Sequence, residues 1–264
     1  METRTHKKVV QKYYSVRSRE YDQQKSRTWK SERGFGAEVI NETLDALRGL
    51  EDKLLLEVGI GSGRIGLPLL ETVNPRLIGL DLSLQMLELA RKKMSLYKQK
   101  LDLILGDADH LPFIKGVFDA LVCISTMHYF TSYERSLAEF SRVLKENGVF
   151  LYGDVSIHEL DKHSFLDRLE KTLSKAHARY YKPSEMVKML ENQGFHVSKM
   201  KTIAYRKSYQ SLMEDKAKFF DIEPEALHKL VQQATKDERK LYSMDDKELT
   251  LFYTLIRGLK EGES

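Results

Sequence analysis

The chain has 264 residues, 41% of them hydrophobic and 31% charged, which is the composition of a globular protein large enough for one α/β domain. No run of 18 or more apolar residues is present and no apolar stretch follows the first residues, so we expect no membrane span, no secretory signal and a cytoplasmic location. Lys and Arg outnumber Asp and Glu by 43 to 39, and this scattered excess does not predict a nucleic-acid surface.

Short apolar runs alternate with helical patterns along most of the chain. The predicted strands occupy residues 53–58, 76–81, 101–105, 118–124, 148–155, 195–204 and 249–257. The predicted helices lie at residues 36–47, 64–73, 83–98, 133–144 and 184–193. This alternation predicts an α/β fold, a Rossmann-like and mostly parallel sheet of seven strands with helices on both faces.

Two regions lie outside this alternation within what we expect to be a single domain. The core spans residues 49–205, and the last strand lies within 248–257. Between them, residues 206–247 are too many for a hairpin turn and carry apolar residues at helical spacing. Because long insertions in compact domains usually serve function, we expect this insertion and residues 1–48 to form an α-helical cap over the substrate. Packing on the sheet edge alone is the alternative.

The turn after the first predicted strand is rich in glycine and is preceded by an acid. Residues 53–63 read Lys-Leu-Leu-Leu-Glu-Val-Gly-Ile-Gly-Ser-Gly, with Glu57 two residues before Gly59. Glycines at such a turn let the backbone approach a ligand closely, and the following helix presents free N–H groups to it. The spacing also fits G-x-G-x-x-G, a weak dinucleotide signal. A pyrophosphate is already anionic, however, so the carboxylate of Glu57 better suits a ligand with a cationic amine.

Acidic residues also follow the second and third predicted strands. Asp81 ends the strand at 76–81, where a carboxylate can accept hydrogen bonds from both hydroxyls of a ribose. Asp107 follows the third strand and is placed to accept from the exocyclic amine of adenine, while the N–H group of Ala108 donates to the ring. Together with Glu57, these residues favour an adenosyl ligand with a cationic amine over a dinucleotide.

At this point the chain resembles the class I S-adenosylmethionine (SAM)-dependent methyltransferases, in particular their small-molecule branch. The resemblance is carried by residues 57–63, 79–86, 106–113, 118–123 and 142–151, which follow one another in the order and spacing of that family. It implies SAM as cofactor and no metal. The residues implied to bind the cofactor are Glu57, Gly59, Ile60, Gly61, Gly63, Asp81, Leu82, Met86, Gly106, Asp107, Ala108 and Ser125.

The segment after the fourth strand offers the candidates for the methyl acceptor. Residues 125–130 lack the Asn- or Asp-Pro-Pro-aromatic turn of enzymes that methylate nucleobase amines, which makes planar exocyclic amines weak candidates. His128 is a candidate base for a hydroxyl, thiol or acidic carbon, with a purely structural role as the alternative. Tyr14, Tyr21 and Tyr129 are candidate substrate-facing aromatic residues.

Basic residues gather near the start of the insertion. They are Lys199, Lys201, Arg206, Lys207, Lys216 and Lys218. A solvated surface explains such a cluster. If the insertion is a lid, an anionic group on the substrate explains it as well.

The sequence therefore predicts an enzyme that transfers a methyl group from SAM to a small-molecule acceptor by in-line displacement. The protein of such an enzyme mainly orients and desolvates the two reactants, so no catalytic dyad is required. Two alternatives stay open, an RNA or tRNA methyltransferase and a non-catalytic SAM-binding partner protein. An NAD-dependent dehydrogenase is disfavoured by Glu57 and Asp107 together.

Overall fold

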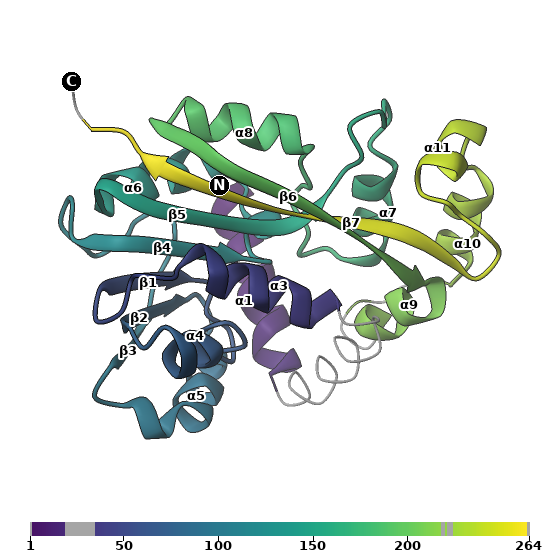
Figure 1. Ribbon diagram of the computed structural model, residues 1–264. Helices are drawn as coiled ribbons and strands as arrows, with labels where there is room; N and C mark the ends of the chain where they lie inside the picture. Colours follow the sequence, from purple (N-terminus) through teal and green to yellow (C-terminus); the bar gives the residue numbers. More distant parts are fainter. Residues whose placement is uncertain (1, 19–34, 218–219, 221–223, 263–264) are drawn as a thin grey trace.

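In the computed structural model, which describes residues 2–18, 35–217, 220 and 224–262, one twisted sheet runs through the molecule (Figure 1). Its strand order is β3-β2-β1-β4-β5-β7-β6. The strands are β1 (Leu54–Val58), β2 (Arg76–Asp81), β3 (Leu101–Leu105), β4 (Phe118–Ile124), β5 (Leu144–Ser156), β6 (Phe195–Ser208) and β7 (Glu248–Lys260). Strands β1 to β5 pair in parallel and β7 pairs antiparallel with both β5 and β6. The predicted mostly parallel, seven-stranded sheet is confirmed.

Helices cover both faces of the sheet. On one face α3 (Phe35–Ala46), α4 (Gly66–Thr72) and α5 (Leu84–Lys93) bury their apolar sides in one core cluster. On the other face α6 (Tyr133–Val143) and α8 (Pro183–Glu191) contribute to a second cluster. Consecutive residues of β1 and β4 belong to opposite clusters, as the alternation of side chains along a strand requires. Both faces of the central strands are therefore dry, which is why these strands read as unbroken apolar runs.

The remaining helices lie beyond the carboxyl ends of the strands. They are α1 (Glu2–Arg17), α7 (Phe165–Leu173), α9 (Tyr209–Ala217), α10 (Pro224–Gln232) and α11 (Lys236–Leu241). Helices α7, α9 and α10 share a third core cluster with the first part of β7 (Figure 1). The α7 segment was not predicted, although Phe165, Leu169 and Leu173 have helical spacing and are fully buried.

Several predicted boundaries shift. Strand β6 continues to Ser208 and β7 to Lys260 because the two strands pair along their whole lengths, from Phe195 opposite Lys260 to Ser208 opposite Glu248. The insertion between them is thus shorter than residues 206–247. The helix predicted at 83–98 ends at Lys93 and is followed by a separate 3₁₀ turn at Ser95–Tyr97.

The strand order reverses between β1 and β4, which are neighbours in the sheet. In open α/β sheets a ligand binds at the carboxyl ends of the strands at such a switch point. The residues predicted at the ends of the first four strands are thereby brought to one crevice. Within the described residues no helix is both long and apolar enough to cross a bilayer.

Replacing Phe140 with Ala tests the packing of the second core cluster. The Phe140 side chain is fully buried on α6, so its loss leaves a cavity, and we expect the free energy of unfolding to fall by about 3–5 kcal/mol in urea titrations. Leu96→Ala is the matched control because Leu96 is 91% exposed, and it should change stability by less than about 0.5 kcal/mol. Equal effects of the two substitutions would contradict the packing described here.

Candidate active site

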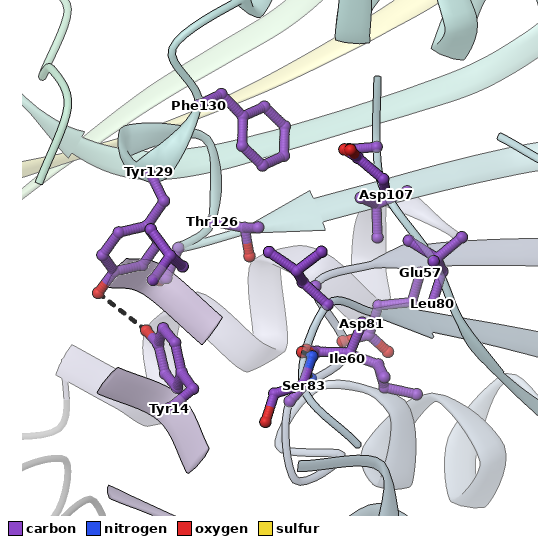
Figure 2. Close-up of a pocket in the computed structure, with 18 of the residues that line it drawn as sticks. Tyr14, Glu57, Ile60, Leu80, Asp81, Ser83, Asp107, Thr126, Tyr129 and Phe130 are labelled. Carbon is purple, nitrogen blue, oxygen red and sulfur yellow. Dashed lines mark hydrogen bonds between the residues drawn. The ribbon is translucent and has the colours of Figure 1, made fainter. Parts of the chain in front are cut away.

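A cavity of about 100 Å³ lies at the switch point, lined by the segments that follow β1, β2, β3 and β4. Helix α1 forms the remaining wall through Lys7, Val10, Gln11 and Tyr14. Figure 2 shows Glu57, Asp81 and Asp107 reaching this space from three different strand ends, with Tyr14 and Tyr129 on its other side. We refer to it as the cofactor cavity.

The glycine turn after β1 has a backbone that only glycine tolerates well. Gly59 has φ +74°, and a Cβ atom there would lie 2.4 Å from the Thr126 side chain. Gly61 has φ +56°, and its N–H group donates to the Asp81 carboxylate at 2.8 Å. A left-handed backbone and close packing against β4 therefore fix these two glycines.

Glu57 is the most constrained acid of the site. Its side chain is 3% exposed, and its Oε2 atom has no hydrogen-bond partner among the described residues. Burial raises the pKa of Glu57 to about 8; the nearby Arg64 opposes this effect and Asp81 adds to it. Gly66 has no side chain and so leaves room for the Glu57 carboxyl group, since a Cβ atom at Gly66 would lie 2.9 Å from Oε2. A buried carboxyl with a spare oxygen fits a ligand that brings a hydrogen-bonding cation.

Asp81 links the second strand to the glycine turn. Its two carboxylate oxygens accept from the N–H groups of Gly61 and Ser83, at 2.8 and 2.9 Å. Burial raises the pKa of Asp81 to about 6, and these backbone hydrogen bonds limit the rise. Each carboxylate oxygen still has a second lone pair, so the group can also accept from the hydroxyls of a ribose.

Asp107 is engaged by helix α1. The Lys7 ammonium group donates to both oxygens of Asp107, at 2.8 and 2.7 Å, and it also pairs closely with Asp109. Asp109 is nearly buried and accepts from the Ser136 hydroxyl. The Asp107 carboxylate, predicted to accept from adenine, thus also accepts from Lys7. The sequence did not predict this ion pair. Lys7 fixes α1 over the cofactor cavity.

Most of the predicted cofactor residues line the cofactor cavity. The lining includes Glu57, Gly59, Ile60, Gly61, Asp81, Leu82, Gly106, Asp107, Ala108 and Ser125. Gly63 and Met86 do not line it. Gly63 shapes the turn with φ +80°, and Met86 is a fully buried core residue next to Gly61. Among the residues that the structure describes, no group of three or more His, Cys, Asp and Glu side chains could hold a metal ion.

A second cavity of about 130 Å³ adjoins the first, and we refer to it as the acceptor cavity. Tyr14, Arg64, Ser125 and Tyr129 line both cavities. The hydroxyl of Tyr14 donates to that of Tyr129 at 2.8 Å, and this pair marks the boundary between them (Figure 2). Tyr21, the other predicted aromatic residue, lies outside the described residues.

His128 lines the acceptor cavity and is paired with Asp154 at the end of β5. Its Nδ1 atom lies 2.9 Å from each carboxylate oxygen of Asp154, and its backbone N–H group donates to one of them at 3.2 Å. The side chains of His128 and Asp154 are 11% and 2% exposed. The sequence provided His128 as a candidate base, and the structure pairs it with Asp154.

Comparison with known proteins agrees with the geometry of the core. A family model described as a methyltransferase domain matches residues 56–152. Malonyl-[acyl-carrier protein] O-methyltransferase of Geobacter sulfurreducens is 36% identical over 116 residues, which cover 42% of this chain and 43% of that protein. The fatty-acid O-methyltransferase of Mycolicibacterium smegmatis is 35% identical over 106 residues, 40% of this chain and 38% of that protein. The chain is thus similar in sequence to methyltransferases over less than half of its length.

Solved structures share the fold of this chain over most of its length. The YcgJ protein of Bacillus subtilis superposes with a TM-score of 0.76 and 21% identity, covering 85% of this chain and 98% of that one. Geranyl diphosphate C-methyltransferase of Streptomyces coelicolor superposes with a TM-score of 0.61 and 13% identity, covering 85% and 79%. By contrast, the sequence matches span less than half the length of these two curated relatives.

Replacing Lys7 with Met tests the role of this residue in holding α1. Losing its ion pairs with Asp107 and Asp109 should destabilise the docked helix by about 1 kcal/mol, since these side chains are at least two-thirds buried. We expect amide hydrogens of residues 2–17 to exchange about fivefold faster, with the core strands unchanged. Lys12→Met, an exposed position on the same helix, should leave the exchange rates as they are. Unchanged exchange in the Lys7 variant would contradict this role.

Proposed function

We propose that this protein transfers a methyl group from SAM, held in the cofactor cavity, to a small molecule in the acceptor cavity. The observation that carries the proposal is the convergence of Glu57, Asp81 and Asp107 on one cavity. Carboxyl groups around a glycine turn suit SAM, which carries a cationic amine, a sulfonium and no phosphate. Bound SAM supplies the activated methyl group, and the protein supplies orientation and a dry site.

The residues fit the separate parts of SAM. Glu57, with its spare oxygen, is suited to the amino-acid end, and Asp81 is suited to the ribose. Ala108 and Asp107 are suited to the adenine ring. Two curated relatives are named as O-methyltransferases, one of malonyl-[acyl-carrier protein] and one of fatty acids, which supports an organic acceptor rather than a nucleic acid.

An RNA or tRNA substrate is less well supported. Three of the basic residues near the insertion pair with carboxylates: Lys199 and Lys201 pair with Glu42, and Arg206 pairs with Glu248. Such pairing leaves little positive potential for a phosphate backbone. Lys218 lies outside the described residues.

Calorimetric titration with SAM and with NAD tests the proposal. We expect saturable binding of SAM and of S-adenosylhomocysteine at one site, and no binding of NAD. The contrary result, NAD binding without SAM binding, would exclude the proposed function.

The raised pKa of Glu57 makes SAM binding depend on pH. At pH 7 the free protein holds a proton on Glu57, because its pKa is about 8. A cationic amine beside it favours the carboxylate, so binding should release up to about one proton. Affinity should therefore rise as the pH increases from about 6.5 to 8 and level off above the pKa of the free protein.

Glu57→Gln is the matched variant because it keeps the shape of the side chain and removes its titration. Titrations in buffers of different ionisation enthalpy should show about one proton fewer released per SAM bound than for the unaltered protein. Equal proton release by the two proteins would show that Glu57 does not meet the cationic end of SAM.

A further inference from the structure

The pair formed by His128 and Asp154 has the geometry of a general base and the carboxylate that orients it. With Nδ1 directed at both oxygens of Asp154, the imidazole presents its Nε2 atom as the free lone pair. The described residues offer no hydrogen bond to Nε2, and His128 belongs to the lining of the acceptor cavity. Asp154 is fixed by the backbone N–H groups of His128 and Val155, so it cannot turn away.

The acceptor cavity has the size and the walls for one aromatic ring. Its volume of about 130 Å³ is close to that of an engineered protein cavity of about 150 Å³ that holds benzene. Aromatic side chains form much of its lining. They are Tyr14, Phe35, Tyr129, Tyr180, Tyr205 and Tyr253.

The charges around the acceptor cavity favour an anion. Its described lining carries four cationic side chains and two carboxylates. Lys216 and Glu170 pair closely with each other, and the other charged residues are Arg17, Arg64, Lys207 and Asp154. A cavity whose lining carries an excess of positive charge attracts a negatively charged ligand.

We propose that the acceptor is a single-ring phenol with an acidic substituent, and that His128 deprotonates its hydroxyl group. This inference rests on the proposed function. The phenol proton moves to Nε2 of His128, and the oxygen lone pair forms the new bond to the methyl carbon. The carbon–sulfur bond of SAM breaks with its electron pair remaining on sulfur, which leaves S-adenosylhomocysteine. Asp154 stabilises the imidazolium that results.

A carboxylate acceptor would have no need of this pair. At neutral pH a carboxyl group is already ionised and can attack the methyl carbon without losing a proton. A phenol, with a pKa of about 10, is almost fully protonated at neutral pH and gains most from a base. The two acceptor classes can therefore be separated by one set of probes.

The test measures methylated products from 4-hydroxybenzoate, benzoate and 4-hydroxy-3-nitrobenzoate with labelled SAM, using mass spectrometry to locate the methyl group. We expect the methyl ether of 4-hydroxybenzoate and no ester of benzoate. With His128→Gln, the rate on 4-hydroxybenzoate should fall by roughly 10²–10⁴-fold. The nitro compound, whose hydroxyl is largely ionised at the assay pH, should lose less than about tenfold, because it needs no base.

His196→Gln is the matched control, since His196 is exposed on β6, and it should behave as the unaltered protein. Asp154→Asn should show the same preference for the nitro compound as His128→Gln, because Asp154 acts through the imidazole. Formation of a benzoate ester, equal losses on both phenols, or no ether from any phenol would overturn the inference. If SAM still binds in calorimetry, any of these outcomes overturns only the inference about the acceptor and leaves the proposed function standing. Failure to bind SAM would contradict the proposed function and the inference together.

Discussion

The architecture of the site depends on placing a carboxyl group, Glu57, in a buried position directly before a tight backbone turn. The turn brings the chain from β1 into α4 within a few residues, and it requires the left-handed backbone of Gly59 and Gly61. Asp81 holds this turn from the neighbouring strand through the N–H group of Gly61. Ionising Glu57 in these buried surroundings costs free energy unless a cation lies beside the carboxylate. The site therefore favours a cationic ligand.

The N-terminal helix completes the site from outside the sheet. Lys7 bridges Asp107 and Asp109, while Tyr14 meets Tyr129 at the boundary of the two cavities. The same helix therefore lines both cavities and is held in place by ion pairs and hydrogen bonds.

The sequence predicted what the chain's local pattern determines. Buried parallel strands appear as apolar runs, and acids at their carboxyl ends fall together once the strands pair, so Glu57 and Asp81 could be located without a structure. Contacts between distant segments could not be predicted in this way. Lys7 lies on a helix whose contact with the segment after β3 has no local signal in the sequence, and α7 was not predicted.

The pairing of His128 with Asp154 could be predicted in part. His128 follows β4, and Asp154 lies near the end of β5. The two strands pair in parallel with Ile124 opposite Gly153, so the register brings both residues to the same edge. The sequence alone did not give this register. It also could not show that Met86 would be absorbed into the core, since a methionine suits an adenine pocket and a helix interior equally well.

The central claim is that acids at successive strand ends hold a cationic adenosyl ligand that has no phosphate. A crystal structure of the complex with S-adenosylhomocysteine, which keeps the amine and the ribose of SAM, tests it most directly. The account predicts the ligand amine within hydrogen-bonding distance of the Glu57 carboxylate and the ribose hydroxyls on Asp81, with adenine beside Asp107 and Ala108. A ligand bound elsewhere, or these carboxylates directed away from it, would contradict the account.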